Sequence, residues 1–406
     1  MRILMIASYL PWPLYGGGGI RMFNIIKELA RRGHRIVLVA GQQGTSLSSD
    51  NTLKQLCEQV HSYALPTKSR LSSTIRSVFS SRPYPALKFQ TPELREKVHD
   101  LLRNEYFDLI WVNFLIMADM LPERLVGNVP TVMDQIEADE LLWQRYVRNG
   151  DLLQRMFSCL NLKKVQSLQK KVLKHMDAIL CVSEAEANFT KSVAPVNTKV
   201  WTVPNGVDTN FFCPASAQKQ DPIILTIGGM SVFRNVDATV WFTQGMFPKI
   251  KQTIPDAQFW IVGSSPDKEV LALQTIPGVV VTGEVEDVRP YYEKARVCVA
   301  SFRFGEGTRL KILEAMAMGV PIVTTNAGCQ GIEVVNGQHV LIANTEADFC
   351  DRVIELLHNP QRAQTIAVAA RALVEQKYEW KEIVGALEPK LQQIVQKAIL
   401  KERTKC

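Results

Sequence analysis

Short runs of apolar, mostly β-branched residues alternate along the whole chain with longer segments in which apolar residues recur at helical spacing. Continuous apolar strands separated by helices are typical of parallel sheets with both faces covered. The pattern therefore predicts an α/β fold built from doubly wound parallel sheets. The expected strands are residues 3–7, 36–40, 109–112, 131–133, 178–182 and 200–203, followed by 223–227, 259–262, 279–282, 297–300, 322–324 and 340–342.

The alternation of strands and helices starts afresh in the middle of the chain. The turn signal Pro204-Asn205-Gly206 and the polar stretch 214–222 separate the two halves. We therefore expect one domain at residues 1–203, a second at 204–380, and a final helix at 381–406 that packs back on the first domain. Ligands of doubly wound folds bind at the carboxyl ends of the strands, so a cleft that the two domains share is the expected active site.

Composition narrows the class of protein. The 406 residues are 46% hydrophobic and 21% charged, which is ordinary for a globular chain. The eight cysteines have no C-x-x-C spacing, which favours reduced thiols over a disulfide framework or a zinc site. No apolar run approaches the ~18–20 residues of a membrane span, and the apolar start is too short for a secretory signal. We therefore expect a cytoplasmic protein.

Positive charge is concentrated in the first half. Residues 1–203 carry 26 lysines and arginines against 18 acidic residues, whereas the remainder carries 21 against 22. An anionic partner is therefore expected for the first domain. No nucleic-acid-binding motif accompanies the charge, so a membrane surface or a phosphate-bearing acceptor is favoured over nucleic acid.

Residues 66–92 have the composition of a helix at a membrane interface. The segment holds no acidic residue, and its five cations are Lys68, Arg70, Arg76, Arg82 and Lys88. Its apolar residues at helical spacing are Leu71, Ile75, Val78 and Phe79. An amphipathic basic helix of this kind binds an anionic leaflet, and residues 163–174 extend the basic patch. The alternative is the solvated face of an ordinary surface helix.

A run of glycines follows the first strand. Gly16, Gly17, Gly18 and Gly19 stand before an amphipathic helix, where they let a ligand approach the free backbone amides, and Arg21 adds a cation. We expect an anion or sugar contact here; the alternative is a flexible turn. The dinucleotide fingerprint is not met, because Arg21 stands where its third glycine belongs.

Residues 305–321 carry the most informative chemistry of the chain. Glu306 and Glu314 stand eight positions apart, the first on a glycine-flanked loop and the second on an apolar helix. Arg309 and Lys311 lie between them at the start of that helix, whose free amides favour an anion. Carboxylates beside cations suit a ligand with hydroxyls at one end and phosphates at the other, such as a nucleotide sugar. The alternative for Lys311 is an exposed residue paired with Glu314.

Four stretches resemble one enzyme family. They are residues 15–21, the Pro-Asn-Gly-Val-Asp run with its two phenylalanines at 204–212, residues 283–292, and the Glu-x7-Glu element at 306–314. With them the chain resembles bacterial glycosyltransferases of family 4, which have two Rossmann-like domains facing across a cleft, the GT-B fold. Within that family it is most similar to sugar transferases of polysaccharide biosynthesis and export.

The resemblance implies an activity and the residues for it. Such an enzyme moves a sugar from a nucleoside diphosphate sugar to a hydroxyl of a glycan or lipid-linked acceptor, with retention and without a metal or cofactor. Glu314 matches the residue that binds the ribose hydroxyls, and Glu306 the one near the transferred sugar. The backbone of Gly307, Thr308 and Leu310 is then expected at the diphosphate or sugar. Glu284 and Val285 are expected beside the base.

One departure from the family concerns the leaving group. Relatives often place an arginine directly after the glycine that ends the first strand of the second domain, and a lysine about six residues later. After Gly228 this chain has Gly229 and Asn235 at those positions, which leaves Arg234 as the segment's only cation. A doubly negative leaving group needs charge stabilisation, so we infer that Arg309 and Lys311 supply it.

An acidic cluster follows the expected strand 131–133. Asp134, Glu137 and Asp139 lie where relatives often have a cleft histidine. We expect Asp134 to orient the acceptor hydroxyl or the sugar; the alternative is a helix N-cap. Two other functions stay open at this point: a GT-B nucleotide-sugar epimerase, and a non-catalytic protein that binds a nucleotide sugar.

Overall fold

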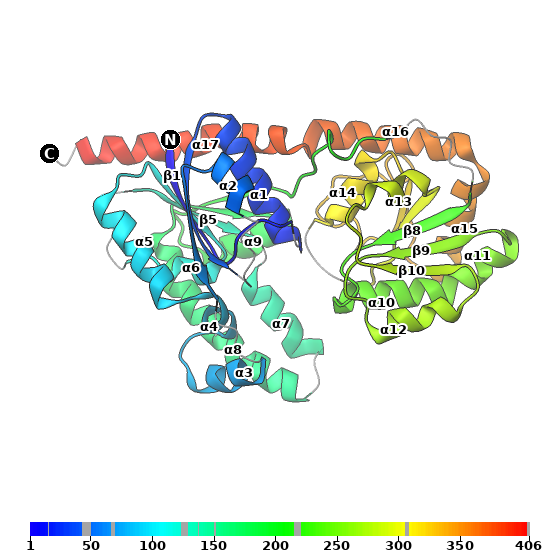
Figure 1. Cartoon of the computed structure of the whole chain (residues 1–406), viewed down its shortest axis with the longest axis horizontal. Coiled ribbons are helices and arrows are strands. Elements are labelled where there is room, and N and C mark those ends of the chain that lie inside the picture. Colours follow the sequence, from blue (N-terminus) through cyan, green and yellow to red (C-terminus); the bar gives the residue numbers. More distant parts are fainter. Residues whose placement is uncertain are drawn as a thin grey trace. The chain divides into compact units, whose positions relative to one another are not determined.

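The computed structural model describes residues 1–14, 16–42, 50–65, 70–122, 129–136, 138–149, 152–214, 221–304 and 308–403. Contacts divide the chain into two compact units (Figure 1). Unit 1 comprises Met1–Val203 with Val384–Cys406, and unit 2 comprises Pro204–Ile383. Each unit has its own sheet and its own apolar core.

Unit 1 is built on a seven-stranded parallel sheet. Its strand order is β3-β2-β1-β4-β5-β6-β7. The central strands are buried on both faces, as continuous apolar runs require. The strands are β1 (Arg2–Ala7), β2 (Arg35–Gln42), β3 (Gln59–Ala64), β4 (Leu109–Asn113), β5 (Thr131–Gln135), β6 (Ala178–Cys181) and β7 (Lys199–Thr202).

β3 is the one strand of unit 1 that the hydrophobic pattern did not predict. It forms an edge of the sheet, pairs only with β2, and is half-exposed along most of its length. Its sequence Gln-Val-His-Ser-Tyr-Ala lacks the apolar run by which buried strands are recognised. An edge strand needs one paired side and little burial, so polar residues suffice there.

Helices lie on both faces of the unit 1 sheet (Figure 1). Thr91 and Ser183 cap two of them by accepting hydrogen bonds from the amides of Leu94 and Glu186. The helical elements are α1 (Gly16–Arg31), α2 (Asp50–Leu56), α3 (Arg70–Phe79), α4 (Tyr84–Phe89), α5 (Pro92–Asn104), α6 (Leu115–Ala118), α7 (Asp139–Asn149), α8 (Leu152–Val172), η2 (Leu173–His175) and α9 (Glu184–Val193).

Unit 2 repeats the plan with six parallel strands. Their order is β10-β9-β8-β11-β12-β13, and each strand falls where the sequence predicts one. The strands are β8 (Ile223–Ile227), β9 (Gln258–Val262), β10 (Val279–Gly283), β11 (Val297–Ala300), β12 (Ile322–Thr324) and β13 (Leu341–Ile342). The helical elements are α10 (Phe233–Trp241), η3 (Phe242–Met246), α11 (Phe247–Thr253), α12 (Lys268–Ala272), η4 (Leu273–Thr275), α13 (Arg289–Lys294), α14 (Leu310–Ala317), α15 (Glu346–His358) and α16 (Pro360–Lys377).

The last helix, α17 (Trp380–Arg403), begins in unit 2 and belongs to unit 1 from Val384 onward. There its Glu388 carboxylate accepts hydrogen bonds from Arg32 at 3.1 Å and lies 2.9 Å from Nε2 of His34. Leu391 of the same helix is fully buried. Among the described residues, no helix combines the length and the apolar character needed to span a bilayer.

Candidate active site

The topology of unit 2 places one ligand position. β8 and β11 are neighbours in the sheet, but the chain leaves β8 toward β9 and leaves β11 toward β12, on the other side. At such a switch point the loops diverge and open a crevice at the carboxyl ends of the strands. The loop after β8 begins at Gly228, and the segment after β11 leads into α14.

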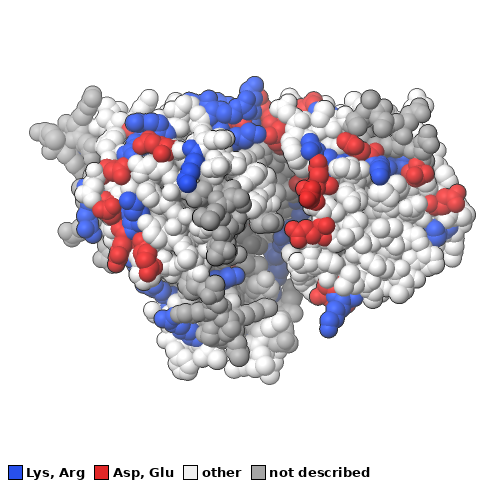
Figure 2. Space-filling view, viewed as in Figure 1, with Lys and Arg blue, Asp and Glu red and all other residues white. Residues whose placement is uncertain are grey.

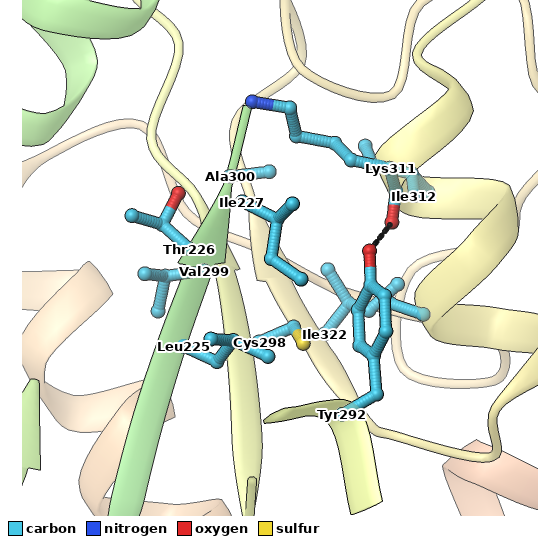
Figure 3. Close-up of a pocket in the computed structure, with 11 residues that line it drawn as sticks. Leu225, Thr226, Ile227, Tyr292, Cys298, Val299, Ala300, Lys311, Ile312 and Ile322 are labelled. Atoms are coloured by element: carbon cyan, nitrogen blue, oxygen red, sulfur yellow. Dashed lines mark hydrogen bonds between the residues drawn. The ribbon is translucent and has the colours of Figure 1, made fainter. Parts of the chain in front are cut away.

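Lys311 reaches from the first turn of α14 to the end of β8 (Figure 3). Its ammonium Nζ donates a hydrogen bond to Oδ1 of Asn235 at 3.3 Å and lies 5.0 Å from the ring centroid of Phe302. The amide of Asn235 is fixed in turn, because its Nδ2 donates to the carbonyl oxygen of Gly229 at 2.8 Å. The lysine is therefore held by Asn235, in the first turn of α10, rather than left to point into solvent.

Glycine at position 228 makes the approach of Lys311 sterically possible. A Cβ built on Gly228 would lie 2.5 Å from Nζ of Lys311, closer than real Cβ contacts come. Gly263, at the end of β9, is required in the same way, since its Cβ would lie 1.8 Å from the carbonyl oxygen of Gly228. The two glycines allow the end of β8 to approach closely both the end of β9 and the Lys311 side chain.

Three cations gather at this crevice. Arg309 is the residue before α14, is buried, and places its guanidinium 4.9 Å from the ring centroid of Phe302. Arg234 lies in the first turn of α10 and is half-buried. Burial, reinforced by the charges of Arg309 and Arg234, lowers the pKa of Lys311 to about 7, although Glu314 opposes the shift. The field at this point favours a negative group, which would restore the charged lysine.

Glu314 lies one turn after Lys311 on α14. The buried hydroxyl of Tyr292, from α13, lies 3.1 Å from Oε2 of Glu314 and 3.3 Å from the carbonyl oxygen of Lys311, and these two acceptors share its single proton. Burial raises the pKa of Glu314, while the Tyr292 hydrogen bond and the Lys311 charge act to lower it. A carboxylate in such surroundings is a strong acceptor for ligand hydroxyls.

The cavity behind these residues is not the ligand site. It is lined by apolar side chains of β8, β11 and α14, with Tyr292 and Lys311 at its border (Figure 3), and its volume is about 10 Å³. A space of that size holds one water molecule at most. A ligand of nucleotide size therefore does not fit in this cavity.

The other predicted donor residues of unit 2 lie on the same edge of the sheet. Thr308 is buried, and Leu310 begins α14. Glu284 and Val285 follow β10, two strands away from β8, which is about 10 Å at the spacing of neighbouring strands. Glu284 is exposed and Val285 packs against the core. Glu306 and Gly307 lie outside the described residues.

In unit 1 the glycine run begins α1. Gly16 and Gly17 are exposed, so the first amides of this helix are accessible to a ligand. Gly18 has no room for a side chain, because a Cβ there would lie 2.5 Å from the hydroxyl oxygen of Tyr9. Gly19 is buried, which leaves the first two glycines as the accessible part of the run.

The structure corrects the expected roles of Asp134 and Arg21. Both side chains are fully buried, and Nε and Nη2 of Arg21 donate to the Asp134 carboxylate at 2.8–3.0 Å. Nη1 of Arg21 also donates to the carbonyl oxygen of Val203 at 2.9 Å. A buried carboxylate bound by arginine cannot reach an acceptor, so we assign this pair to the architecture of unit 1. Asp139 begins α7, and Glu137 lies outside the described residues.

Three residues of the site were not recognised in the sequence. Asn235 was noted only as the position without the family's lysine, yet its amide orients Lys311. Tyr292 and Phe302 come from α13 and from the segment after β11. Tyr292 lies within one of the four stretches that resemble the family, and this position could have identified it as a site residue. No sequence feature pointed to Phe302.

Comparisons with known proteins agree with this architecture. The family described as Glycosyltransferase Family 4 matches residues 15–211, and that described as Glycosyl transferases group 1 matches residues 221–359. A Klebsiella pneumoniae protein, described as an uncharacterized 44.6 kDa protein in the cps region, is 18% identical over 95% of this chain and 98% of its own length.

Solved structures show the same fold at low sequence identity. Sucrose-phosphate synthase from Thermosynechococcus elongatus aligns with a TM-score of 0.71 at 17% identity, over 97% of this chain and 99% of its own. The Anabaena protein HepE, solved in complex with UDP-glucose, aligns with a TM-score of 0.64 at 16% identity, over 97% of this chain and all of its own. The chain therefore belongs to the family 4 glycosyltransferases, and its two Rossmann-like units are those of the GT-B fold.

Proposed function

We propose that the protein transfers a sugar from a nucleoside diphosphate sugar to a hydroxyl of a glycan or lipid-linked acceptor, with retention and without a metal ion. The observation that carries the proposal is the position of the Lys311 ammonium at the end of β8, one turn before the Glu314 carboxyl on the same helix. One ligand could then bind the cations through its phosphates and the Glu314 carboxylate through its hydroxyls. HepE, which has the same fold, was solved with UDP-glucose.

The cations would stabilise the leaving diphosphate. Lys311, Arg309 and Arg234 together supply the positive charge that a metal ion supplies in metal-dependent transferases. Losing one electrostatic contact to a developing negative charge typically lowers kcat by about 10² to 10³. Asn235 contributes by holding the lysine at the end of β8, where relatives carry their own lysine.

The carboxylate would bind the nucleoside end. Glu314 accepts hydrogen bonds from the ribose hydroxyls, and Tyr292 keeps its carboxylate oriented. By resemblance, Glu284 and Val285 lie beside the base, Gly307, Thr308 and Leu310 contact the diphosphate or sugar, and Glu306 lies near the transferred sugar.

Unit 1 would carry the acceptor at the start of α1, where the amides of Gly16 and Gly17 are accessible. In the reaction the bond from the anomeric carbon to the diphosphate oxygen breaks, and the bond to the acceptor oxygen forms on the same face. The acceptor proton passes to the departing diphosphate. We place the reaction in polysaccharide or lipopolysaccharide assembly, in the cytoplasm at the inner face of a membrane, in keeping with the acid-free basic segment 66–92.

Thermal unfolding with UDP, GDP, ADP and their sugars, with and without EDTA, tests the donor site. A ligand at 100 times its Kd adds about 2.7 kcal/mol to the free energy of unfolding, or several degrees in Tm. We expect one nucleotide series to shift Tm equally with and without EDTA.

The Lys311→Gln variant should lose that shift, because the amide cannot provide the charge on the phosphates. Lys249→Gln is the matched control, since Lys249 is an exposed lysine on α11. No shift with any nucleotide, or an equal shift in both variants, would remove the donor assignment. A shift that EDTA abolishes would contradict metal independence.

A further inference from the structure

One end of unit 1 exposes large apolar side chains on two helices. On α3 they are Ile75, Val78 and Phe79, spaced for one helix face, and Phe79 is 88% exposed. On the first turns of α8 they are Leu152, Leu153 and Met156, and Leu153 is 79% exposed. We call these six residues the apolar tip. Several large apolar side chains exposed on two neighbouring helices are typical of an interaction site.

The two helices are joined to each other. The hydroxyl of Ser77 on α3 donates to Oδ1 of Asn161 on α8 at 3.3 Å, and the Lys164 ammonium donates to the carbonyl oxygen of Ser77. Ser77 is buried against α8, while its neighbours Arg76 and Val78 are exposed. α3 therefore packs on α8 through Ser77, while Ile75, Val78 and Phe79 are exposed to solvent. Figure 1 shows the position of the two helices.

Apart from Asp151, which directly precedes Leu152 in the sequence, the charges of the segments that carry the apolar tip are positive. Neither 66–92 nor 152–176 contains an acidic residue. The exposed cations of these segments include Arg76, Arg82, Lys88, Arg155 and Lys163. Figure 2 shows this end of unit 1, at the bottom of the view, as uncharged surface with blue side chains beside it and no red among the residues described there.

We propose that the apolar tip inserts into the headgroup region of an anionic lipid bilayer, with the surrounding cations on lipid phosphates. Exposed apolar side chains framed by lysine and arginine are the pattern of an interfacial membrane contact. A second copy of the chain is a poorer occupant, because a symmetric contact would bring these cations against one another with only Asp151 of each copy as an acid beside the tip. The inference rests on the proposed function in one respect: a transferase with lipid-linked acceptors has a reason to bind the membrane that holds them.

Binding of the full chain to vesicles tests the proposal. Vesicles of phosphatidylcholine with about a third phosphatidylglycerol are compared with pure phosphatidylcholine, at low and high salt. We expect flotation with the anionic vesicles at low salt and weaker binding in the other conditions. The variant Phe79→Ser/Leu153→Ser should bind about tenfold more weakly, since two apolar side chains no longer enter the interface.

Matched variants separate the tip from the rest of the surface. Val196→Ser/Val368→Ser removes two exposed valines elsewhere and should bind as wild type. Arg76→Gln/Arg155→Gln should weaken binding roughly fivefold per cation, whereas Lys191→Gln/Lys199→Gln, on exposed lysines outside the tip, should have much less effect.

Three results would overturn the proposal. The wild type does not float with anionic vesicles, or the Phe79/Leu153 variant floats as well as wild type, or that variant converts a dimer in solution into a monomer. The Tm shift with the donor nucleotide is measured on every variant in parallel. Because the tip is in unit 1 and the donor residues are in unit 2, an unchanged shift separates failure of the membrane proposal from failure of the donor site.

Discussion

The amine of Lys311 lies at the end of β8 because position 228 has no side chain. Charge, not only shape, then governs what binds there, since burial and two neighbouring arginines keep the pKa of this lysine at about 7 in the free protein. In the proposed donor complex, the protonated lysine is the form that would bind the diphosphate. Binding in neutral or alkaline solution therefore includes the uptake of a proton.

Donor affinity should fall as the pH rises through 7. Above this pH the free protein carries a neutral Lys311, and each further unit costs up to tenfold in affinity while the lysine in the complex stays charged. Titration calorimetry from pH 6 to 9 with a nucleotide sugar, whose diphosphate does not titrate in this range, measures the effect. In Lys311→Gln the dependence should disappear; an unchanged slope would assign it to another group.

Gly228→Ala should weaken donor binding through Lys311. The added Cβ overlaps the position of Nζ, so the ammonium is displaced from Asn235. A double-mutant cycle with Lys311→Ala tests this route, because the glycine substitution should have little further effect once the lysine is gone. Additive losses would mean that Gly228 acts through the backbone instead.

Tyr292→Phe should raise the donor KM about tenfold and leave the fold intact. The change removes only the hydroxyl that donates to Glu314, and hydrogen bonds to charged groups contribute about 1.5–3 kcal/mol. Glu314→Gln should have the larger effect, because it removes the negative charge and replaces one of the two oxygens proposed to accept from the ribose hydroxyls with an NH2 donor. Equal KM values for Tyr292→Phe and wild type would show that Glu314 needs no partner.

The sequence supported only part of this site. Glu314, Lys311 and Arg309 were singled out because they lie within one short motif, where chain neighbours become spatial neighbours. Tyr292 and Asn235 join them from α13 and α10, across about 20 and 75 residues of chain, and only tertiary packing brings such residues together. Asp134 and Arg21 were predicted to contact a ligand, but they bind each other instead. The two residues are 113 positions apart, and no local sequence pattern indicates such a pair.

At the scale of elements, the hydrophobic pattern identified every described strand except β3. The reason is physical: central parallel strands are buried on both faces and must be apolar, whereas an edge strand is held by backbone hydrogen bonds on one side. Another edge strand, β13 in unit 2, is shorter than expected: it has two residues where the sequence predicted three.

Asp134→Asn should destabilise unit 1 strongly. The Arg21–Asp134 pair joins α1 to β5 and, through the carbonyl of Val203, to the end of the first half of the chain. Breaking a buried pair leaves an uncompensated charge and costs about 3–5 kcal/mol. Asp348→Asn is the control, because its pair with Arg352 is exposed and should contribute no more than about 1 kcal/mol. Denaturant unfolding of both variants measures the difference.

At the scale of the molecule, two units with separate cores predict two unfolding transitions. The donor nucleotide should raise only the transition of unit 2. Leu391→Ala should lower that of unit 1 by about 2–5 kcal/mol, because this fully buried side chain of α17 covers unit 1. Differential scanning calorimetry distinguishes the two effects. A single transition that responds to both changes would show that the units unfold together.

The arrangement of Gly228, Asn235 and Lys311 also has an evolutionary consequence. We expect positions 235 and 311 to change together, since the Asn235 amide orients the Lys311 ammonium at the end of β8. A lineage that acquires a lysine at position 235 no longer needs one at 311, whereas position 228 should stay a glycine in both cases, because its φ of +157° strains any side chain. Homologous chains should therefore divide into two classes at these sites, with few intermediates, because a chain caught between them has either no phosphate-binding lysine or two that repel each other.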